Sequence, residues 1–231
     1  FTDWDLNSDY WIDFNMESVD FDHPIWVLFS SGTTGKPKAI THRTGGILIE
    51  QYKSLSLHQN ISDEDRFFWN TTTGWMMWNY ALGSLLCGAK LCLYDGAANY
   101  PDIGVQWRFA KEAKINHFGN GSPLFIATMK QNIKDVNEME LSKLKTIGAT
   151  GSPLSEDAFI WMQDKLPKTQ IISLSGGTDV CSAFIGGCTM LPVYSGYLQC
   201  NMLGAAIEAW DENKKPILNQ TGELVITQPL P

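Results

Sequence analysis

The sequence predicts an α/β fold in which helices flank a mainly parallel sheet, with a small antiparallel β element at the C-terminal end. One observation favours the parallel sheet: short apolar runs alternate with amphipathic stretches between residues 25 and 174. From Tyr194 onward, apolar and polar residues alternate around a polar turn, which is typical of an antiparallel pair.

Six apolar runs have the length of strands. They are Ile25–Phe29, Arg66–Asn70, Ala89–Tyr94, Ile115–Gly119, Lys145–Ala149 and Gln170–Leu174. Because helical patterns separate most of them, right-handed crossovers make the predicted sheet mainly parallel. We expect the first run, Ile25–Phe29, to be a buried strand of this sheet.

Start signals favour three helices between the strands. Ser122 and Pro123 form an N-cap and a first helical position, and Glu156 and Asp157 place acids in a first turn, where the helix dipole favours them. The predicted helices are Ile103–Lys114, Leu124–Asn132 and Ala158–Leu166.

The pattern divides the chain into three predicted regions. Residues 1–24 would be an acidic peripheral segment, because seven acidic residues lie between Asp3 and Asp22. Residues 25–193 would form the α/β unit. Residues 194–231 would begin a β subdomain, in which Ala205–Trp210 and Glu223–Thr227 form an antiparallel hairpin.

Composition excludes several classes of protein. The 231 residues include 17 Lys and Arg against 25 Asp and Glu, a formal net charge of −8, so we expect no nucleic-acid partner. The five cysteines form no C-x-x-C pair, which favours a reducing, cytoplasmic setting over disulfides or zinc. We interpret Cys181 and Cys188 as a chance pair rather than metal ligands. No apolar run has the length of a membrane span, and no signal-peptide pattern occurs.

Residues 30–38 carry the clearest chemical signal. They read Ser-Ser-Gly-Thr-Thr-Gly-Lys-Pro-Lys, directly after an apolar run. Glycines allow a close backbone approach, hydroxyls and amides can surround phosphate oxygens, and lysine supplies charge. The segment is not a Walker loop, because two residues rather than four separate Gly32 from Gly35. Taken alone, it could also be a Gly/Thr surface turn.

Three further loops follow predicted strands: Thr71–Trp75, Gly148–Pro153 and Ser175–Asp179. Ligands of open parallel sheets bind beyond the carboxyl ends of the strands. We therefore expect these loops and residues 30–38 to converge on one site.

Five ordered segments resemble the motifs of the adenylate-forming superfamily, which contains acyl-CoA synthetases, firefly luciferases and peptide-synthetase adenylation domains. The segments are Ser30–Lys38, Thr72–Asn79, Ala149–Leu154, Ser175–Asp179 and Gly222–Val225. Within the superfamily, Gly74–Asn79, Leu93–Gly96 and Ser175–Asp179 are similar to the motifs of acetoacetate-activating acyl-CoA synthetases. The resemblance covers the chain from about Pro24 to its end.

The resemblance implies a ligase that activates acetoacetate with ATP to an acyl-adenylate and then forms acetoacetyl-CoA, AMP and pyrophosphate. ATP, acetoacetate and coenzyme A would be substrates, and Mg²⁺ would assist. The alternatives are another short-chain acyl-CoA synthetase or adenylation domain, or a nucleotide-binding module without catalysis.

The same resemblance assigns the ATP-binding residues. The loop would hold the departing pyrophosphate, Thr178 would contact the α-phosphate, and the Asp179 carboxylate would help to hold Mg²⁺, which prefers oxygen ligands. Lys38 and Thr178 would be catalytic. The ATP-binding set is Ser31, Gly32, Thr33, Thr34, Gly35, Lys36, Lys38, Gly151, Ser152, Pro153, Thr178 and Asp179.

Each assignment has a structural alternative. Ser152, expected beside the adenine, could instead or also be the N-cap of the following helix. Thr178-Asp179 could be a helix cap, and Lys38 a solvated surface lysine. His42 lies near the loop, and we interpret it as an incidental turn or surface residue rather than a phosphate ligand.

The acyl pocket is assigned to Trp75, Met76, Gly176 and Gly177. Acetate-specific relatives carry a bulky tryptophan at the position that aligns with Gly176, so glycine would leave a longer cavity for a four-carbon oxoacid. The alternatives are that Gly176 serves the turn alone and that Trp75 and Met76 are core residues at a helix start.

The chain begins with Phe1 and stops after a strand-like run, so we expect an internal piece of a larger N-terminal domain. The ribose-binding acid and the catalytic lysine of the superfamily would lie beyond Pro231. By itself the piece would then be inactive, and apolar surface left uncovered would favour self-association.

Overall fold

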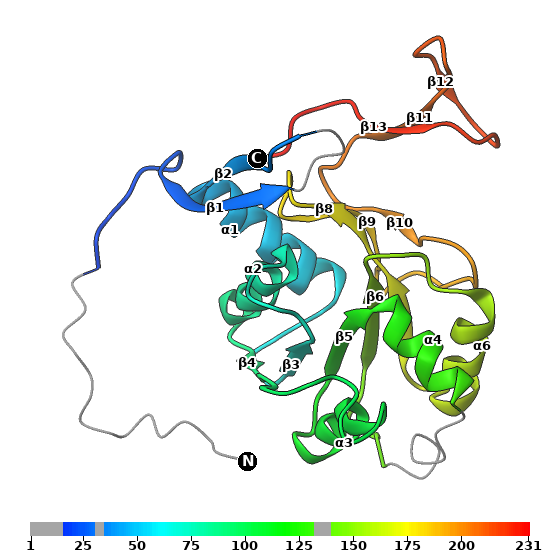
Figure 1. Ribbon diagram of the computed structural model, residues 1–231. Coiled ribbons are helices and arrows are strands. Elements are labelled where there is room, and N and C mark those ends of the chain that lie inside the picture. Colours follow the sequence, from blue (N-terminus) through cyan, green and yellow to red (C-terminus); the bar gives the residue numbers. More distant parts are fainter. Residues whose placement is uncertain (1–15, 31–34, 132–139) are drawn as a thin grey trace.

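The computed structural model describes residues 16–30, 35–131 and 140–231, and its centre is a five-stranded parallel sheet (Figure 1). The strands are β3 (Arg66–Trp69), β4 (Lys90–Leu91), β5 (His117–Gly121), β6 (Thr146–Thr150) and β7 (Gln170–Ser173), in the spatial order β4-β3-β5-β6-β7. The predicted α/β fold with a parallel sheet is confirmed. The order reverses between β3 and β5, which is where ligands bind in sheets of this kind.

Helices cover both faces of the sheet because side chains alternate along each strand. Phe68, Phe118 and Ile147 belong to the hydrophobic core on one face. Phe67 and Ile172 belong to the core on the other face. The first core involves α3 (Val105–Glu112), α4 (Ser122–Lys130) and α6 (Glu156–Lys165), and the second involves α1 (Thr44–Tyr52) and α2 (Met76–Gly83).

The three predicted helices are present, with shifted ends. Ser155 caps α6, since its Oγ accepts a hydrogen bond of 3.3 Å from the Ala158 amide. The alternative that Ser152 caps this helix is therefore wrong. Gly121, not Ser122, is the N-cap of α4, and the Ser122 hydroxyl donates a 2.6 Å hydrogen bond to the Ser152 carbonyl instead.

Sequence patterns did not predict α1 or the π-helical turn η1 (Lys53–His58) and 3₁₀ turn η2 (Ser84–Cys87). Helix α1 begins with Thr44, Gly45 and Gly46, which are poor helix formers. Leu48 and Ile49 are exposed in the same helix, so apolar residues follow no clear helical period.

The run Ile25–Phe29 is a strand, but not a buried strand of the central sheet. It belongs to β1 (Pro24–Ser30), which pairs antiparallel with β2 (Lys38–Arg43) in a separate two-stranded sheet. Val27 and Phe29 are 48% and 66% exposed, so one face of the hairpin lies in solvent. All five residues of the run are apolar, so the sequence shows no alternation between a buried and an exposed face. Periodicity alone therefore does not separate a fully buried strand from one that is buried on one face.

Two antiparallel sheets follow β7. The first has the order β10-β9-β8, formed by β8 (Ser175–Gly177), β9 (Ser182–Gly186) and β10 (Cys200–Asn201). The second contains the predicted hairpin as β11 (Ile207–Trp210) and β13 (Glu223–Ile226), with the short β12 (Pro216–Ile217) added. Figure 1 shows it projecting from the body. The proposed region boundaries at residues 24 and 193 stay predictions.

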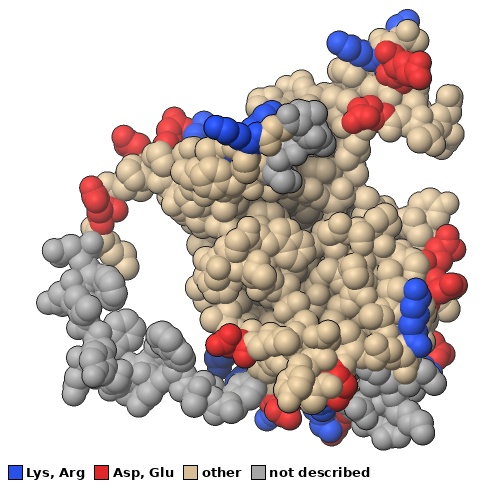
Figure 2. All heavy atoms as spheres, viewed as in Figure 1, with Lys and Arg blue, Asp and Glu red and all other residues tan. Residues whose placement is uncertain are grey.

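Charged side chains lie mainly at the margins of the face shown in Figure 2 and on its projecting sheet. Uncharged residues cover most of the centre of this face. Within the described ranges, no helix is both long and apolar enough to cross a membrane.

Candidate active site

Two adjoining cavities lie at the carboxyl ends of β6 and β7. Cavity A, of about 320 Å³, is lined by residues 150–154, Phe159, residues 173–176, Val193 and residues 196–198. Cavity B, of about 130 Å³, is lined by residues 75–77, Tyr80, residues 150 and 151, Leu174, residues 176–178, Ser182 and Ala183. Thr150, Gly151, Leu174 and Gly176 line both cavities, so these are neighbouring parts of one site.

The wall between the cavities depends on the turn after β6. Gly151 has φ +83°, a conformation that favours glycine, and a Cβ added to it would lie 3.6 Å from Trp75 Cζ2. The Thr150 hydroxyl donates a 2.8 Å hydrogen bond to the Leu174 carbonyl, which joins the ends of β6 and β7. The predicted residues Gly151, Ser152 and Pro153 all line cavity A.

Trp75, Met76, Gly176 and Gly177, the residues of the predicted acyl pocket, all line cavity B. Met76 and Met77 also belong to the buried core, so the core interpretation is confirmed for Met76, and the acyl-pocket assignment stays a prediction. Burial raises the pKa of Tyr80, whose hydroxyl accepts a hydrogen bond from Gln59 and lies 2.7 Å from Ser54 Oγ. A neutral, anchored tyrosine therefore forms part of the pocket wall.

The two glycines of β8 differ in the space that their missing side chains would occupy. A Cβ at Gly176 would collide with the Ser182 carbonyl oxygen and lie 2.9 Å from Ala183 Cα, both in the backbone of β9. The expectation that Gly176 sets the pocket length is thus not supported, and the close approach of β9 explains this glycine. A Cβ at Gly177 would meet nothing within 4 Å, so this position has room for a side chain.

Thr178 and Asp179 lie in the tight turn between β8 and β9, so the helix-cap alternative is wrong. Cys181 closes this turn with φ +46°, and its amide lies 3.0 Å from the Gly177 carbonyl, to which it donates a hydrogen bond. Burial raises the pKa of Cys181 to about 12, so its thiol stays protonated and structural. Asp179 is exposed and Thr178 half-buried.

The β1–β2 hairpin approaches this turn through His42. The His42 Nε2–H donates to the carbonyl oxygens of Thr178, at 2.9 Å, and Asp179, at 3.1 Å. The expectation of an incidental turn or surface residue is wrong, because His42 is buried and spans two elements.

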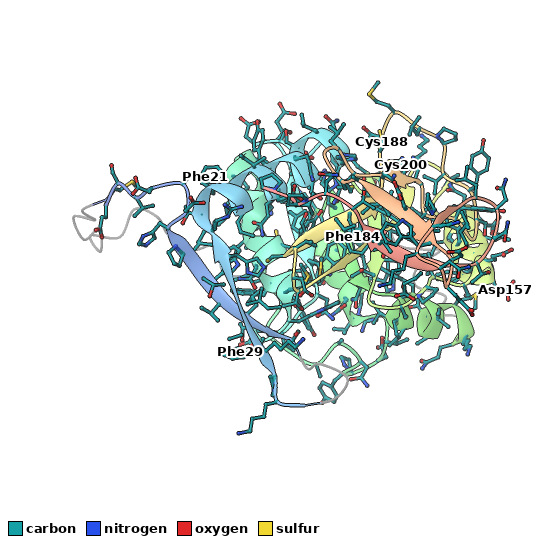
Figure 3. All side chains as sticks on the ribbon, turned by 90° about the horizontal axis from the view of Figure 1, so that it is seen from above. Phe21, Phe29, Asp157, Phe184, Cys188 and Cys200 are labelled. Carbon is teal, nitrogen blue, oxygen red and sulfur yellow. The ribbon has the colours of Figure 1, made fainter. Side chains whose placement is uncertain are left out.

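Lys38 lies on the same side of the hairpin as His42. Residues two apart in a strand share a face, so Lys38, Ile40 and His42 point to one side. The rise per residue of a strand puts the Cα atoms of Lys38 and His42 roughly 13 Å apart. Trp26 and Leu28 oppose His42 and Ile40 in the register and pack against the core, so this face turns inward. Figure 3 labels Phe29, near the end of the hairpin, and Phe184 on β9.

A third cavity, cavity C, lies at the switch point of the sheet. It measures about 880 Å³ and is lined by residues 68–73, Trp75, Trp78, residues 93–96, Ala98, residues 120 and 121, Pro123 and Leu124. Asn70 Nδ2 donates to Asn120 Oδ1 at 3.4 Å, and Asn120 Nδ2 donates to Gln106 Oε1 at 2.6 Å. Trp75 lines both cavity B and cavity C, so the three cavities form one series.

The predicted convergence of loops is therefore seen for three of the four. Residues 71–73 and 75, 150–153 and 175–178 line these neighbouring cavities. Of the fourth loop, Gly35, Lys36 and Lys38 are exposed, while Ser31, Gly32, Thr33 and Thr34 lie outside the described residues. Sequence reasoning missed Val193 and Tyr197 in cavity A and the Asn70–Asn120 pair, which belong to no recognised motif.

Comparisons with known proteins agree with this architecture. The family model described as "AMP-binding enzyme" matches residues 3–230. The chain therefore belongs to the AMP-binding enzyme family. The solved structure of acetoacetyl-CoA synthetase from Streptomyces lividans matches with a TM-score of 0.89 and 45% identity, covering 93% of this chain and 34% of that one.

Curated relatives point in the same direction. The chain is 39% identical to acetoacetyl-CoA synthetase from Gallus gallus and 40% identical to acetoacetyl-coenzyme A synthetase from Rhizobium meliloti, over 93% of its length in both cases. It spans about a third of the length of these relatives, 32% and 33%. The anthranilate CoA ligase AuaEII, solved with anthranoyl-AMP, has a TM-score of 0.80 at 18% identity and so shares the fold.

Proposed function

We propose that the whole protein containing this chain is an acid–thiol ligase that activates acetoacetate with ATP and transfers the acyl group to coenzyme A. The observation that carries the proposal is that cavities A and B meet at Gly151 and Gly176. Thr178 lines cavity B close to this meeting point. A site that joins a carboxylate to a nucleotide needs two such pockets that open onto the same phosphorus atom. The acetoacetyl-CoA synthetases among the relatives support the choice of acid.

In this proposal cavity A receives the adenine against Gly151, Ser152 and Pro153. Cavity B receives the acid beside Trp75 and Met76, and its small volume of about 130 Å³ favours a short chain. The loop from Ser31 to Lys36, together with Lys38, holds the β- and γ-phosphates. Lysine ammonium groups neutralise the charge that collects on the departing pyrophosphate.

The acid's carboxylate oxygen attacks the α-phosphorus, the bond to pyrophosphate breaks, and an acyl-adenylate forms. The Thr178 hydroxyl donates a hydrogen bond to the α-phosphate. The coenzyme A thiol then attacks the acyl carbon, and AMP leaves with the oxygen that came from the acid. By confining the acid, cavity B brings its carboxylate into a geometry suited to this attack.

Asp179 and Thr178 offer oxygen ligands that fit Mg²⁺, which takes few protein carboxylates and keeps other positions for phosphate and water. When bound, the ion would neutralise phosphate charge. The exposure of Asp179 leaves its carboxylate accessible to such a complex. A reducing, cytoplasmic location belongs to the same proposal. So does self-association of this piece by itself, through exposed apolar side chains such as Leu85 and Leu86.

Pyrophosphate exchange into ATP tests the proposal. The whole protein is assayed with acetoacetate, acetate, propionate and butyrate at equal concentrations, and exchange is expected to be fastest with acetoacetate. No exchange with any of the four acids would contradict adenylation of a short acid. A strong preference for acetate would contradict the assignment of acetoacetate.

A further inference from the structure

We infer that His42 is a positioning residue, which fixes the distance between the phosphate-binding hairpin and the Thr178–Asp179 turn. This inference rests on the proposed function, because it assigns the two parts that His42 joins to the same nucleotide. His42 is 7% exposed and touches neither cavity A nor cavity B. It acts through the backbone of Thr178 and Asp179 rather than on substrate.

The two hydrogen bonds of His42 define its role. Both partners are carbonyl oxygens, so Nε2 carries the proton and donates to both, at 2.9 and 3.1 Å. Nδ1 is buried and has no hydrogen-bond partner in the described part of the chain. The only N–H of the ring therefore donates to this turn. The hydrogen bonds join residues more than 130 positions apart in the sequence.

The hairpin is separate from the central sheet, so the side chains of its inward face, Trp26, Leu28 and His42 among them, connect it to the rest of the protein. Strands β1 and β2 pair only with each other among the described strands. Beside His42 lies cavity D, of about 480 Å³, lined by His42, Arg43, Ile47, Glu50, Asp179, Val180 and residues 226–231. Packing is thus incomplete between the hairpin and the turn, and the hydrogen bonds of His42 cross this loosely packed boundary.

The hydrogen bonds of His42 affect how the proposed phosphate-binding groups are placed relative to one another. Lys38 extends from the same face of β2 as His42, and Thr178 and Asp179 carry the carbonyls that His42 binds. When His42 is in place, the cation on one element and the hydroxyl and carboxylate on the other keep a fixed separation. A displacement of about 1 Å in such a constellation can lower a rate by about 10²-fold.

The chain offers a matched control in His58, a second buried histidine that joins distant elements. His58 Nδ1–H donates to the Gly187 carbonyl at 2.9 Å, and its Nε2 accepts from the Leu203 amide at 3.0 Å. Gly187 follows the end of β9 and Leu203 follows β10, so neither contact involves the Thr178–Asp179 turn. Loss of His58 therefore removes comparable buried bonds without touching the turn.

The experiment compares His42→Leu, His42→Gln, His42→Asn and His58→Leu in the whole protein. Gln reaches as far as Nε2 and retains a donor, whereas Asn is one methylene shorter. We expect His42→Leu and His42→Asn to lower kcat/KM for ATP by about 10–100-fold, with KM for acetoacetate changed less than about twofold. His42→Gln should recover most of the loss, and His58→Leu should lower Tm without this selective effect.

Calorimetric titration with ATP is the second measurement, and it separates failure of this inference from failure of the proposed function. If the wild-type protein shows no exchange with any acid, the proposed function fails, yet weaker ATP binding in His42→Leu and recovery in His42→Gln would still support the positioning role. Equal losses in His42→Leu and His58→Leu at matched Tm would overturn it. No recovery in His42→Gln, with a normal Tm, would also overturn it.

Discussion

Lys38→Ala and Asp179→Ala are each expected to lower the rate of adenylate formation by about 10²–10³-fold, the usual effect of losing one key electrostatic contact in a transition state. Both residues are exposed, so truncation leaves no cavity and no buried polar group. The free energy of unfolding should therefore change by no more than about 0.5 kcal/mol. Exchange rates and chemical denaturation curves, measured on the same preparations, check both parts.

Lys168→Ala and Asp164→Ala are the matched controls for these two variants. Lys168 is exposed in the segment after α6, and Asp164 is an exposed residue near the end of α6. Neither lines cavity A, B or C. Unchanged exchange in Lys38→Ala or Asp179→Ala would leave that residue outside the phosphate site, and so would a loss of rate fully explained by unfolding.

Asp65→Asn is expected to lower the free energy of unfolding by about 3 kcal/mol at pH 7, the lower end of the range for breaking a buried ion pair. Asp65 is fully buried before β3 and accepts hydrogen bonds from Lys145 Nζ, at 2.6 Å, and from the Ser62 amide, at 3.0 Å. His117 Nε2 lies 3.5 Å from Asp65 Oδ2, the oxygen that also accepts from the Ser62 amide. Lys145 is 52% exposed and can return to water, which limits the loss.

The same carboxylate predicts a pH dependence. Burial by itself would raise the pKa of Asp65, but the neighbouring His117 side chain, Lys145 and the Ser62 amide outweigh burial and hold the pKa well below its usual range. The stabilisation is thus complete above the unfolded pKa of about 4 and is lost as the pH falls further. Asp65→Asn should flatten this acid limb, whereas the exposed Asp164→Asn should not. Identical acid limbs in wild type and Asp65→Asn would contradict the assignment.

Local signals in the sequence predicted the parts of the fold that depend on local chemistry. The acids Glu156 and Asp157 placed α6, and the apolar run 170–174 placed β7, where Ile171 and Ile172 pack on opposite faces. Helix α1 could not be predicted in the same way. Its first turn contains two glycines, so packing of Ile47 against the core, rather than propensity, accounts for it.

The candidate site, too, could be predicted only where it depends on local sequence signals. The loops at residues 71–75, 148–153 and 175–179 were predictable because parallel strands bring their carboxyl ends to one edge of the sheet. The position of β1 was not, since its pairing with β2 depends on contacts rather than on the apolar run itself. The role of His42 was hidden for a similar reason, because its partners are backbone carbonyls far along the chain.

Oxygen transfer tests the central claim, an acetoacetyl-adenylate formed between cavities A and B, most directly. The whole protein is incubated with ATP, coenzyme A and acetoacetate labelled with ¹⁸O in its carboxylate, and the nucleotide products are analysed by mass spectrometry. We predict that AMP carries one ¹⁸O atom, because the acid's oxygen bonds to the α-phosphorus and stays there when the thiol takes the acyl group. Unlabelled AMP, or ADP formed with the label in inorganic phosphate, would contradict the account.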